Sequence, residues 1–508
     1  MREQFFHQHF WGGLAAMFVA CLVAIFAYRF DAGLFPLAFA AVFTAVLAAR
    51  EPSLGLAAVF GELFSNPHGH LFFFDDLAIP VSLRMAVFIG FFVGWAVFFI
   101  RTGTLPHLHA WRFAPLIPLT LAILIGFTVG LASQPTLDAF KDGNAYLYLL
   151  YAFPILTTEW TSARKHQLLQ LFAAGAVWNL LLTLVILYVF THFDEGILRS
   201  SYVFLRDIRL AEITNLGNGT HRIFIQSQFF TLALGALLLA FMSFSHRKIV
   251  PASVALGSVI AVILLSLSRS FWIGIAAAFL VLLILLARSG VRAWFPLALR
   301  TFLGGVFAII LILVVALFPL PSQRLGGGEL ADALRRRSET DVAVSSRWAL
   351  IPPMKNAIAE HPVFGSGFGQ RVSFITDDPR ARELRPDGVW STYAMEWGWL
   401  ELWLKMGILG PLGFLFLFVS LVVQLLKQNT HQAWVGIGLV SGLVFLYATH
   451  AFSPYLNHPI GLGFLLFTMA FLPTPAHPIP QTAVPTGLPL LKQTRAPSSA
   501  VSLQSEVK

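Results

Sequence analysis

Two things are scarce in this sequence, namely cysteine and charge. Of the 508 residues only Cys21 is a cysteine, and Asp, Glu, Lys and Arg together make up 12%. A single cysteine excludes an internal disulfide bond and any paired-thiol motif. Charged residues account for about a quarter of an ordinary soluble domain. The low share here excludes a typical water-soluble protein.

Apolar residues are abundant instead, at 57% of the chain, and they occur in repeated runs of about twenty, the length that crosses about 30 Å of hydrocarbon. We therefore predict an all-α polytopic membrane protein with about twelve to fourteen transmembrane helices. The first run has no small-residue cleavage site, so we interpret it as a retained span. The predicted spans are 10–28, 32–48, 53–66 (short for a bilayer), 79–100, 114–132, 143–158, 167–192, 226–243, 250–266, 270–287, 301–320, 399–425, 432–449 and 456–472.

The net charge is +9, and the distribution of Lys and Arg among the short loops predicts the orientation of these spans. Lys and Arg concentrate in one set of alternate short loops, which should be cytoplasmic, whereas the other set includes acidic turns such as Asp75-Asp76. Both termini then lie inside, and 193–225, the turn at Ser268–Ser270 and a long loop face outward. The predicted organisation is an N-terminal bundle (1–320), a large outward loop (321–398), C-terminal transmembrane helices (399–472) and a disordered cytoplasmic tail (473–508).

The outward loop is the polar part of the chain where chemistry or recognition is expected. Ser345 or Ser346 can cap a helix running to Ile358, in which Pro352-Pro353 introduces a kink. The following run, Gly365-Ser366-Gly367-Phe368-Gly369, has neither the strand nor the lysine of a nucleotide-binding loop. We interpret it as a turn where backbone approaches a ligand or a neighbouring helix.

Three arginines are candidates for an anion site. Arg269 is held between two apolar spans, where a charge is costly and functional by default. Arg222 and Arg347 are predicted on the same side of the membrane, and converging guanidinium groups suit a phosphate or pyrophosphate. The alternative is that Arg269 extends to lipid headgroups.

Glu396 is the candidate base, at the junction of the loop with the next span. Its carboxylate could accept a proton from a sugar hydroxyl, with Trp397 and Trp399 stacking on sugar faces. An interfacial aromatic belt with an incidental acid is the alternative, and Glu401 is a rival for the same role. The last outward turn is flanked by two more candidate substrate contacts, His450 and His458, whose spacing does not make a metal site.

In their order and spacing these motifs resemble the O-antigen ligase and O-antigen polymerase superfamily over about residues 200–472. The matching segments are Ser268-Arg269-Ser270 opening a span, Arg347-Trp348 followed by Pro362-x-x-Gly365-x-Gly367-x-Gly369, and Leu400-Glu401-Leu402-Trp403-Leu404-Lys405-Met406-Gly407-Ile408-Leu409-Gly410.

The resemblance implies a GT-C-like helical bundle in the bacterial inner membrane with its active site on the periplasmic face. It implies an inverting glycosyltransferase that uses no metal or other cofactor and takes a glycan from undecaprenyl pyrophosphate. By position, Arg222, Arg269 and Arg347 would bind the pyrophosphate. Ligases of this kind carry a His at the loop-to-span junction, where this chain has Glu396, so the resemblance favours a polymerase of O-antigen or exopolysaccharide repeat units.

Two alternatives stay open. One is a ligase that transfers the glycan to lipid A-core or to a protein. The other is a transporter of the lipid-linked glycan, for which Arg84, inside a predicted span, is the supporting residue. The expected partners are the undecaprenyl-pyrophosphate-linked glycan and the bilayer, with a flippase and a chain-length regulator as further candidates. A nucleic-acid partner is not expected.

Overall fold

The computed structural model describes residues 2–75, 80–103, 110–217, 220–244, 249–290, 294–321, 347–376, 379–427 and 433–473. Residues 1–473 form one compact unit. The predicted tail, except for its first residue, and the predicted helix caps Ser345 and Ser346 lie outside the described residues.

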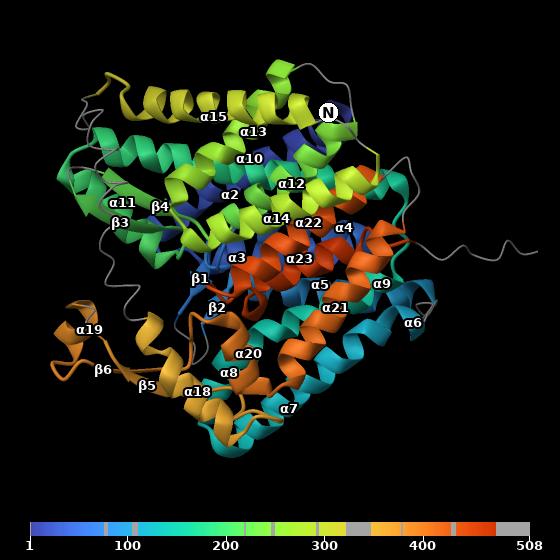
Figure 1. Cartoon of the computed structure of the whole chain (residues 1–508), viewed down its shortest axis with the longest axis vertical. Coiled ribbons are helices and arrows are strands. Elements are labelled where there is room, and N and C mark those ends of the chain that lie inside the picture. Colours follow the sequence, from blue (N-terminus) through green and yellow to red (C-terminus); the bar gives the residue numbers. More distant parts are fainter. Residues whose placement is uncertain are drawn as a thin grey trace, which may run out of the picture. The chain divides into compact units, whose positions relative to one another are not determined.

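The described chain is predominantly helical (Figure 1) and contains nine helical segments long and apolar enough to cross a membrane. Four shorter apolar helices complete the set, which confirms an all-α polytopic membrane protein. The long segments are α2 (Gln8–Arg29), α5 (Leu83–Thr102), α6 to α7 (Ala110–Ser133), α10 (Ser162–His192), α13 (Ile249–Ser266), α14 (Arg269–Arg288), α15 (Trp294–Ala316), α21 (Leu409–Leu426) and α22 (Ala433–His450). The short ones are α3 (Leu34–Arg50), α4 (Pro52–Ser65), α12 (Gln228–Phe244) and α23 (Pro459–Met469).

Two predicted spans are not continuous α-helices. Segment 143–158 is a 3₁₀ helix, η2 (Asn144–Tyr151), followed by the short α9 (Ala152–Thr157). Tyr148 and Tyr151 are both buried, at the three-residue spacing that one face of a 3₁₀ helix presents. Segment 399–425 is divided at Gly407, whose φ of +63° ends α20 (Gly398–Met406) before α21 begins.

Within the described residues, three antiparallel strand pairs accompany the helices: β1 (Phe73–Phe74) with β2 (Val81–Ser82), β3 (Glu212–Gly217) with β4 (Thr220–Phe224), and β5 (Val372–Ile375) with β6 (Val389–Thr392). The loop predicted to face outward therefore contains strands as well as helices, because β5 and β6 lie between α18 (Ile351–Glu360) and α20, with α19 (Pro379–Leu384) between the strands. Pro352 and Pro353 occupy the first turn of α18, where proline fits. The helical residues 347–349 end in a turn at Leu350 before α18 begins, so the predicted helix is interrupted next to the prolines. The remaining short helices are α1 (Arg2–Phe5), α8 (Thr136–Gly143), α11 (Glu195–Asp207) and the 3₁₀ turn η4 (Tyr455–Asn457).

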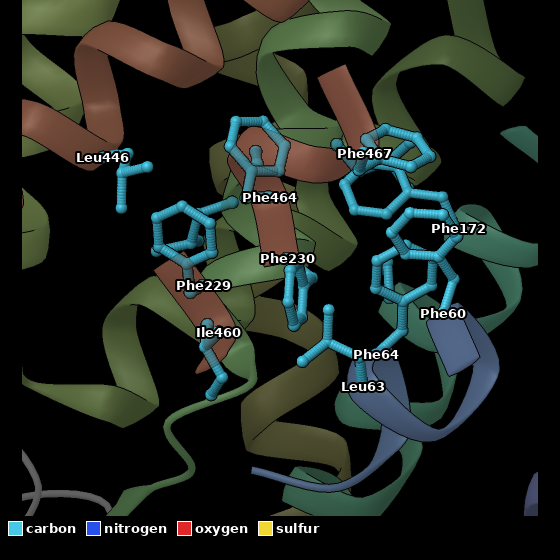
Figure 2. Close-up of a cluster of buried hydrophobic side chains, with 14 of the residues drawn as sticks. Phe60, Leu63, Phe64, Phe172, Phe229, Phe230, Leu446, Ile460, Phe464 and Phe467 are labelled. Atoms are coloured by element: carbon cyan, nitrogen blue, oxygen red, sulfur yellow. The ribbon is translucent and has the colours of Figure 1, made fainter. Parts of the chain in front are cut away.

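Aromatic side chains hold the centre of the bundle (Figure 2). Phe64 of α4 makes edge-on ring contacts with Phe172 of α10, Phe230 of α12 and Phe467 of α23, at 4.9 to 5.5 Å between centroids. These rings are almost fully buried. Such contacts add about 0.5–1.5 kcal/mol each beyond the area they bury. They fix four helices from distant parts of the sequence around one core.

Arg84, the charge expected inside a span, has a local partner. Its guanidinium forms two hydrogen bonds of 3.1 Å with the carboxylate of Glu62, and it also donates to the carbonyls of Asn66 and Pro67. Both side chains of the pair are at most one-tenth exposed. The charge therefore links α4 to the start of α5.

Candidate active site

The two charged candidates from the loop contact each other. Arg347, just before α18, forms an ion pair with Glu396, just before α20. The side chains are 39% and 49% exposed respectively, so the pair is reachable from solution. Glu401, the rival base, is 4% exposed. The accessible carboxylate at this junction is that of Glu396.

Tryptophans surround this ion pair. The indole N–H of Trp397 donates to the carbonyl oxygen of Arg347 at 2.8 Å, which ties the two ends of the described loop together. The ring of Trp397 also packs against Trp348 at 5.2 Å and against Phe452 at 5.6 Å. Trp397 is half-buried by these contacts, whereas Trp348 is 60% exposed. The exposed indole that packs on Trp397 is that of Trp348, which the sequence interpretation named in a motif but not as a sugar contact.

Arg269 is presented by a tight turn between α13 and α14. Ser266, Ser268 and Ser270 are buried, and the hydroxyls of Ser268 and Ser270 lie 3.1 Å apart. Leu267 has a φ of +48°, an uncommon conformation for a residue with a branched side chain. The turn holds the serines inside and leaves Arg269 exposed as the first residue of α14.

Arg222 lies beside the same turn. It is part of β4, and its Nε donates to the carbonyl oxygen of Ser266 at 3.0 Å. Its guanidinium also lies 4.7 Å from the ring centroid of Phe224, a cation–π distance. Arg222 and Arg269, which we call the arginine site, are thus attached to one turn of the backbone.

The arginine site and the loop pair lie at the same end of the bundle. The Ser453 hydroxyl, in the turn after α22, donates to the Ser270 hydroxyl at 3.0 Å. Its neighbour Phe452 contacts the ring of Trp397. This short chain of contacts runs from the residue after Arg269 to the residue after Glu396. These contacts bring Arg222, Arg269 and Arg347 to one end of the bundle.

The two histidines differ in accessibility. His450 is fully buried, and its Nδ1 accepts the backbone N–H of Leu456 at 3.2 Å. Trp399 packs edge-on against this ring at 5.0 Å. His458 is half-buried. Burial lowers the pKa of His458 to about 4, and the nearby charges of Lys405 and Arg84 act in the same direction. A neutral His458 suits a sugar hydroxyl better than a phosphate.

The glycine run packs against backbone. A Cβ at Gly365 would lie 2.4 Å from the nitrogen of Gly407, and one at Gly367 would lie 2.2 Å from the nitrogen of Gly130. Both glycines have a positive φ, near +80°. Of the two possibilities raised by the sequence, ligand or neighbouring helix, these contacts correspond to the helix. Gly365 and Gly367 dock the loop onto α7 and onto the junction between α20 and α21.

A buried group of three charges lies next to this docking site. The ammonium of Lys405 forms ion pairs with Glu401 and, at 2.5 Å, with Asp142 of α8. The three side chains are 3 to 6% exposed. Asp142 accepts a second hydrogen bond, from the backbone N–H of Gly369 at 2.8 Å. We call these three residues the charge triad. Their pairing could not be read from a sequence in which Asp142 stands far from the other two.

Comparison with known families was made with this geometry in hand. Residues 252–415 match the family model described as O-antigen ligase. Over these residues the chain is similar to that family, which is consistent with the O-antigen ligase and polymerase superfamily. The matched region begins in α13 and ends in α21, so it contains Arg269, Arg347, Glu396 and the glycine run. It confirms the resemblance inferred from the motifs.

The superfamily match indicates a ligase- or polymerase-type function in a multi-pass membrane protein. No curated protein and no solved structure matched the chain. Among the described residues, no group of three or more His, Cys, Asp or Glu side chains is arranged to hold a metal ion.

Proposed function

We propose that this protein is an inner-membrane glycosyltransferase that polymerises oligosaccharide repeat units carried on undecaprenyl pyrophosphate. The observation that carries the proposal is the accessible Arg347–Glu396 ion pair, connected through Trp397 and Phe452 to the turn that presents Arg269. The active site lies on the periplasmic face, where the lipid-linked units are joined.

The arginine site binds the donor. Arg222 and Arg269 are attached to the same turn, and guanidinium groups can grip pyrophosphate oxygens through paired hydrogen bonds. Arg269 is also the first residue of α14, and the positive end of a helix of 20 residues favours an anion. As the bond between the anomeric carbon and the pyrophosphate breaks, negative charge grows on the pyrophosphate, and these groups stabilise it.

Glu396 activates the acceptor. A sugar hydroxyl of the second repeat unit attacks the anomeric carbon of the first from the face opposite the pyrophosphate. The carbon–oxygen bond to the pyrophosphate breaks, the new glycosidic bond forms, and the hydroxyl proton passes to the Glu396 carboxylate. Undecaprenyl pyrophosphate leaves with the bonding electron pair. Arg347 holds the carboxylate in place and lies within reach of the donor phosphate charge.

Trp348 supports the acceptor sugar. Its indole is 60% exposed and contacts the ring of Trp397, whose neighbour in the chain is Glu396. A flat apolar ring beside a base is suited to the C–H face of a pyranose, leaving the sugar hydroxyls for the carboxylate. His458, which immediately precedes α23, is a further contact for a sugar hydroxyl.

Ligation is the second candidate, and the description of the matching family model favours it. In that case the acceptor would be lipid A-core or a protein, and Glu396 would serve the same chemical step. Transport is disfavoured, because Arg84 has a buried carboxylate partner in Glu62 and contributes to packing between α4 and α5.

Purified protein in nanodiscs, supplied with undecaprenyl-pyrophosphate-linked repeat units alone, separates the two enzymes. A polymerase produces a ladder of longer lipid-linked glycans. A ligase produces no ladder and transfers glycan once lipid A-core or an acceptor protein is added. The second result would contradict polymerisation.

A further inference from the structure

The charge triad buries three charged side chains in a chain that has few of them. Removing three charges from water costs several kcal/mol per ion, and buried ion pairs often add little net stability. The best-attested role of such groups is to fix one register between elements. The triad therefore calls for an explanation in terms of what it aligns.

The triad connects α20 to α8. Glu401 and Lys405 lie one turn apart on α20, whereas Asp142 lies near the end of α8. Burial would lower the pKa of Lys405, but the two carboxylates outweigh that effect and raise it, so the ammonium stays charged. Asp142 is the member that reaches across to another helix.

Asp142 also fixes the glycine run. Besides Lys405, it accepts the N–H of Gly369, and the run continues the attachment through backbone bonds to α20. Ser366 donates to the carbonyl of Leu404 at 2.7 Å, and Gly367 donates to that of Lys405 at 3.2 Å. The loop, α8 and α20 are held at one point.

The other end of α20 carries the proposed base. The N–H of Glu401 donates to the carbonyl of Trp397 at 2.8 Å, so the helix is hydrogen-bonded directly to the turn that contains Glu396. Met395 is 1% exposed and packs in the loop core with Leu404 of α20. A shift of α20 along α8 would therefore move Glu396.

We propose that Asp142 is a positioning residue, which, through Lys405 and Gly369, holds Glu396 in register with the arginine site. The assignment rests on the proposed function for its effect on catalysis, but the mechanical link stands on the contacts alone. Asp142 touches neither substrate. It acts through α20, and a misplacement of about 1 Å at a reacting group is enough to slow catalysis about 100-fold.

Two matched variants test this link. Asp142→Ala removes the α8 carboxylate that pairs with Lys405. Asp138→Ala, the control, removes the other α8 carboxylate, which pairs with Arg371 of the loop, and leaves the charge triad intact. Only Asp142→Ala disconnects α20 from α8 and from the glycine run. Hydrogen exchange of the peptide covering residues 393–397, the thermal midpoint, kcat and the donor KM are measured for each protein in nanodiscs.

We expect Asp142→Ala to speed exchange in the 393–397 turn about tenfold and to lower kcat about 10- to 100-fold, with the donor KM within about twofold. Asp138→Ala should change each quantity much less, because its partner Arg371 does not belong to α20. Equal behaviour of the two variants, or unchanged exchange in a folded Asp142→Ala protein, would overturn the proposal. Hydrogen exchange needs no substrate, so a failure of the proposed function leaves this part of the test intact.

Should Asp142→Ala not fold, Asp142→Asn replaces it. The asparagine oxygen still accepts the Gly369 N–H while the charge that holds Lys405 is lost. Its exchange rate in the 393–397 turn should lie above that of Asp138→Ala, and a rate at or below that of Asp138→Ala contradicts the proposal.

Discussion

Arg347 and Glu396 form an ion pair that joins the beginning and the end of the described part of the loop. Both side chains are accessible, at 39% and 49% exposed, and a hydrogen bond from Trp397 to the Arg347 carbonyl joins the same two segments. An ion pair this exposed contributes at most about 1 kcal/mol to stability. The ion pair is therefore better explained by what its two groups do to a substrate than by its effect on stability.

Donor binding at the arginine site should depend on the geometry of the two guanidinium groups. Arg222→Ala and Arg269→Ala should each lower kcat/KM for the donor about 10- to 100-fold, since each removes charge-assisted hydrogen bonds to the pyrophosphate. Lysine at either position keeps the charge without the paired donors and should restore only part of the activity. Initial rates at varied donor concentration measure this.

Arg101→Ala is the control for that experiment. Arg101 lies at the carboxyl end of α5, where it donates to the backbone carbonyl of Arg50. An equal loss with Arg101→Ala would mean that total positive charge matters and that the turn between α13 and α14 has no special role.

Trp348 distinguishes sugar stacking from membrane anchoring. Trp348→Ala should raise the KM for a soluble repeat-unit acceptor about fivefold, because an aromatic contact contributes about 1 kcal/mol. Trp348→Phe should restore most of the affinity, and Trp348→Leu should not. If leucine works as well as phenylalanine, the side chain serves the lipid interface and the assignment to the acceptor is wrong.

Gly367 is required by the docking of the loop. Gly367→Ala should destabilise the protein by about 2–4 kcal/mol, since φ is +83° and the new methyl group would lie 2.2 Å from the nitrogen of Gly130. Gly305→Ala is the matched control, because nothing lies within 4 Å of a Cβ there and the residue is helical. Thermal unfolding in detergent reports both, and equal midpoints would refute the tight contact.

Substitutions of Arg84 and its partner Glu62 distinguish an enzyme from a transporter. Arg84→Met alone leaves Glu62 buried without its partner and should cost about 3–5 kcal/mol of stability. The double variant Glu62→Gln/Arg84→Met removes both charges, so it should fold and keep its glycosyltransferase activity. A folded double variant that has lost its function would instead support a role for Arg84 on a transport pathway.

Much of the fold could be predicted from the sequence, since apolar runs of sufficient length leave few alternatives to spans. The prediction of continuous helical spans failed for two segments that are long enough to cross a bilayer. In these segments local chemistry decides where the α-helix breaks. Gly407 divides one expected span, and the buried tyrosines at 148 and 151 favour a 3₁₀ helix in another. Composition and periodicity do not report such local breaks.

The site was predicted unevenly for a related reason. Arg222, Arg269, Arg347 and Glu396 stand out because charge is rare here, and they do share one end of the bundle. Trp348 was not predicted as a sugar contact, since the exposure of an indole ring depends on which neighbouring side chain covers it. Asp142 could not be identified, because its partners come from a distant segment and only folding brings them together.

The central claim is that Glu396 activates the acceptor hydroxyl while repeat units are joined. The most direct measurement follows undecaprenyl pyrophosphate release and glycan length together, in wild type and in Glu396→Gln, with lipid-linked repeat units as the sole substrate. The account predicts a ladder with one pyrophosphate released per bond in the wild type, and a rate at least about 100-fold lower in the variant at an unchanged thermal midpoint. An identical ladder from the folded Glu396→Gln protein would contradict it.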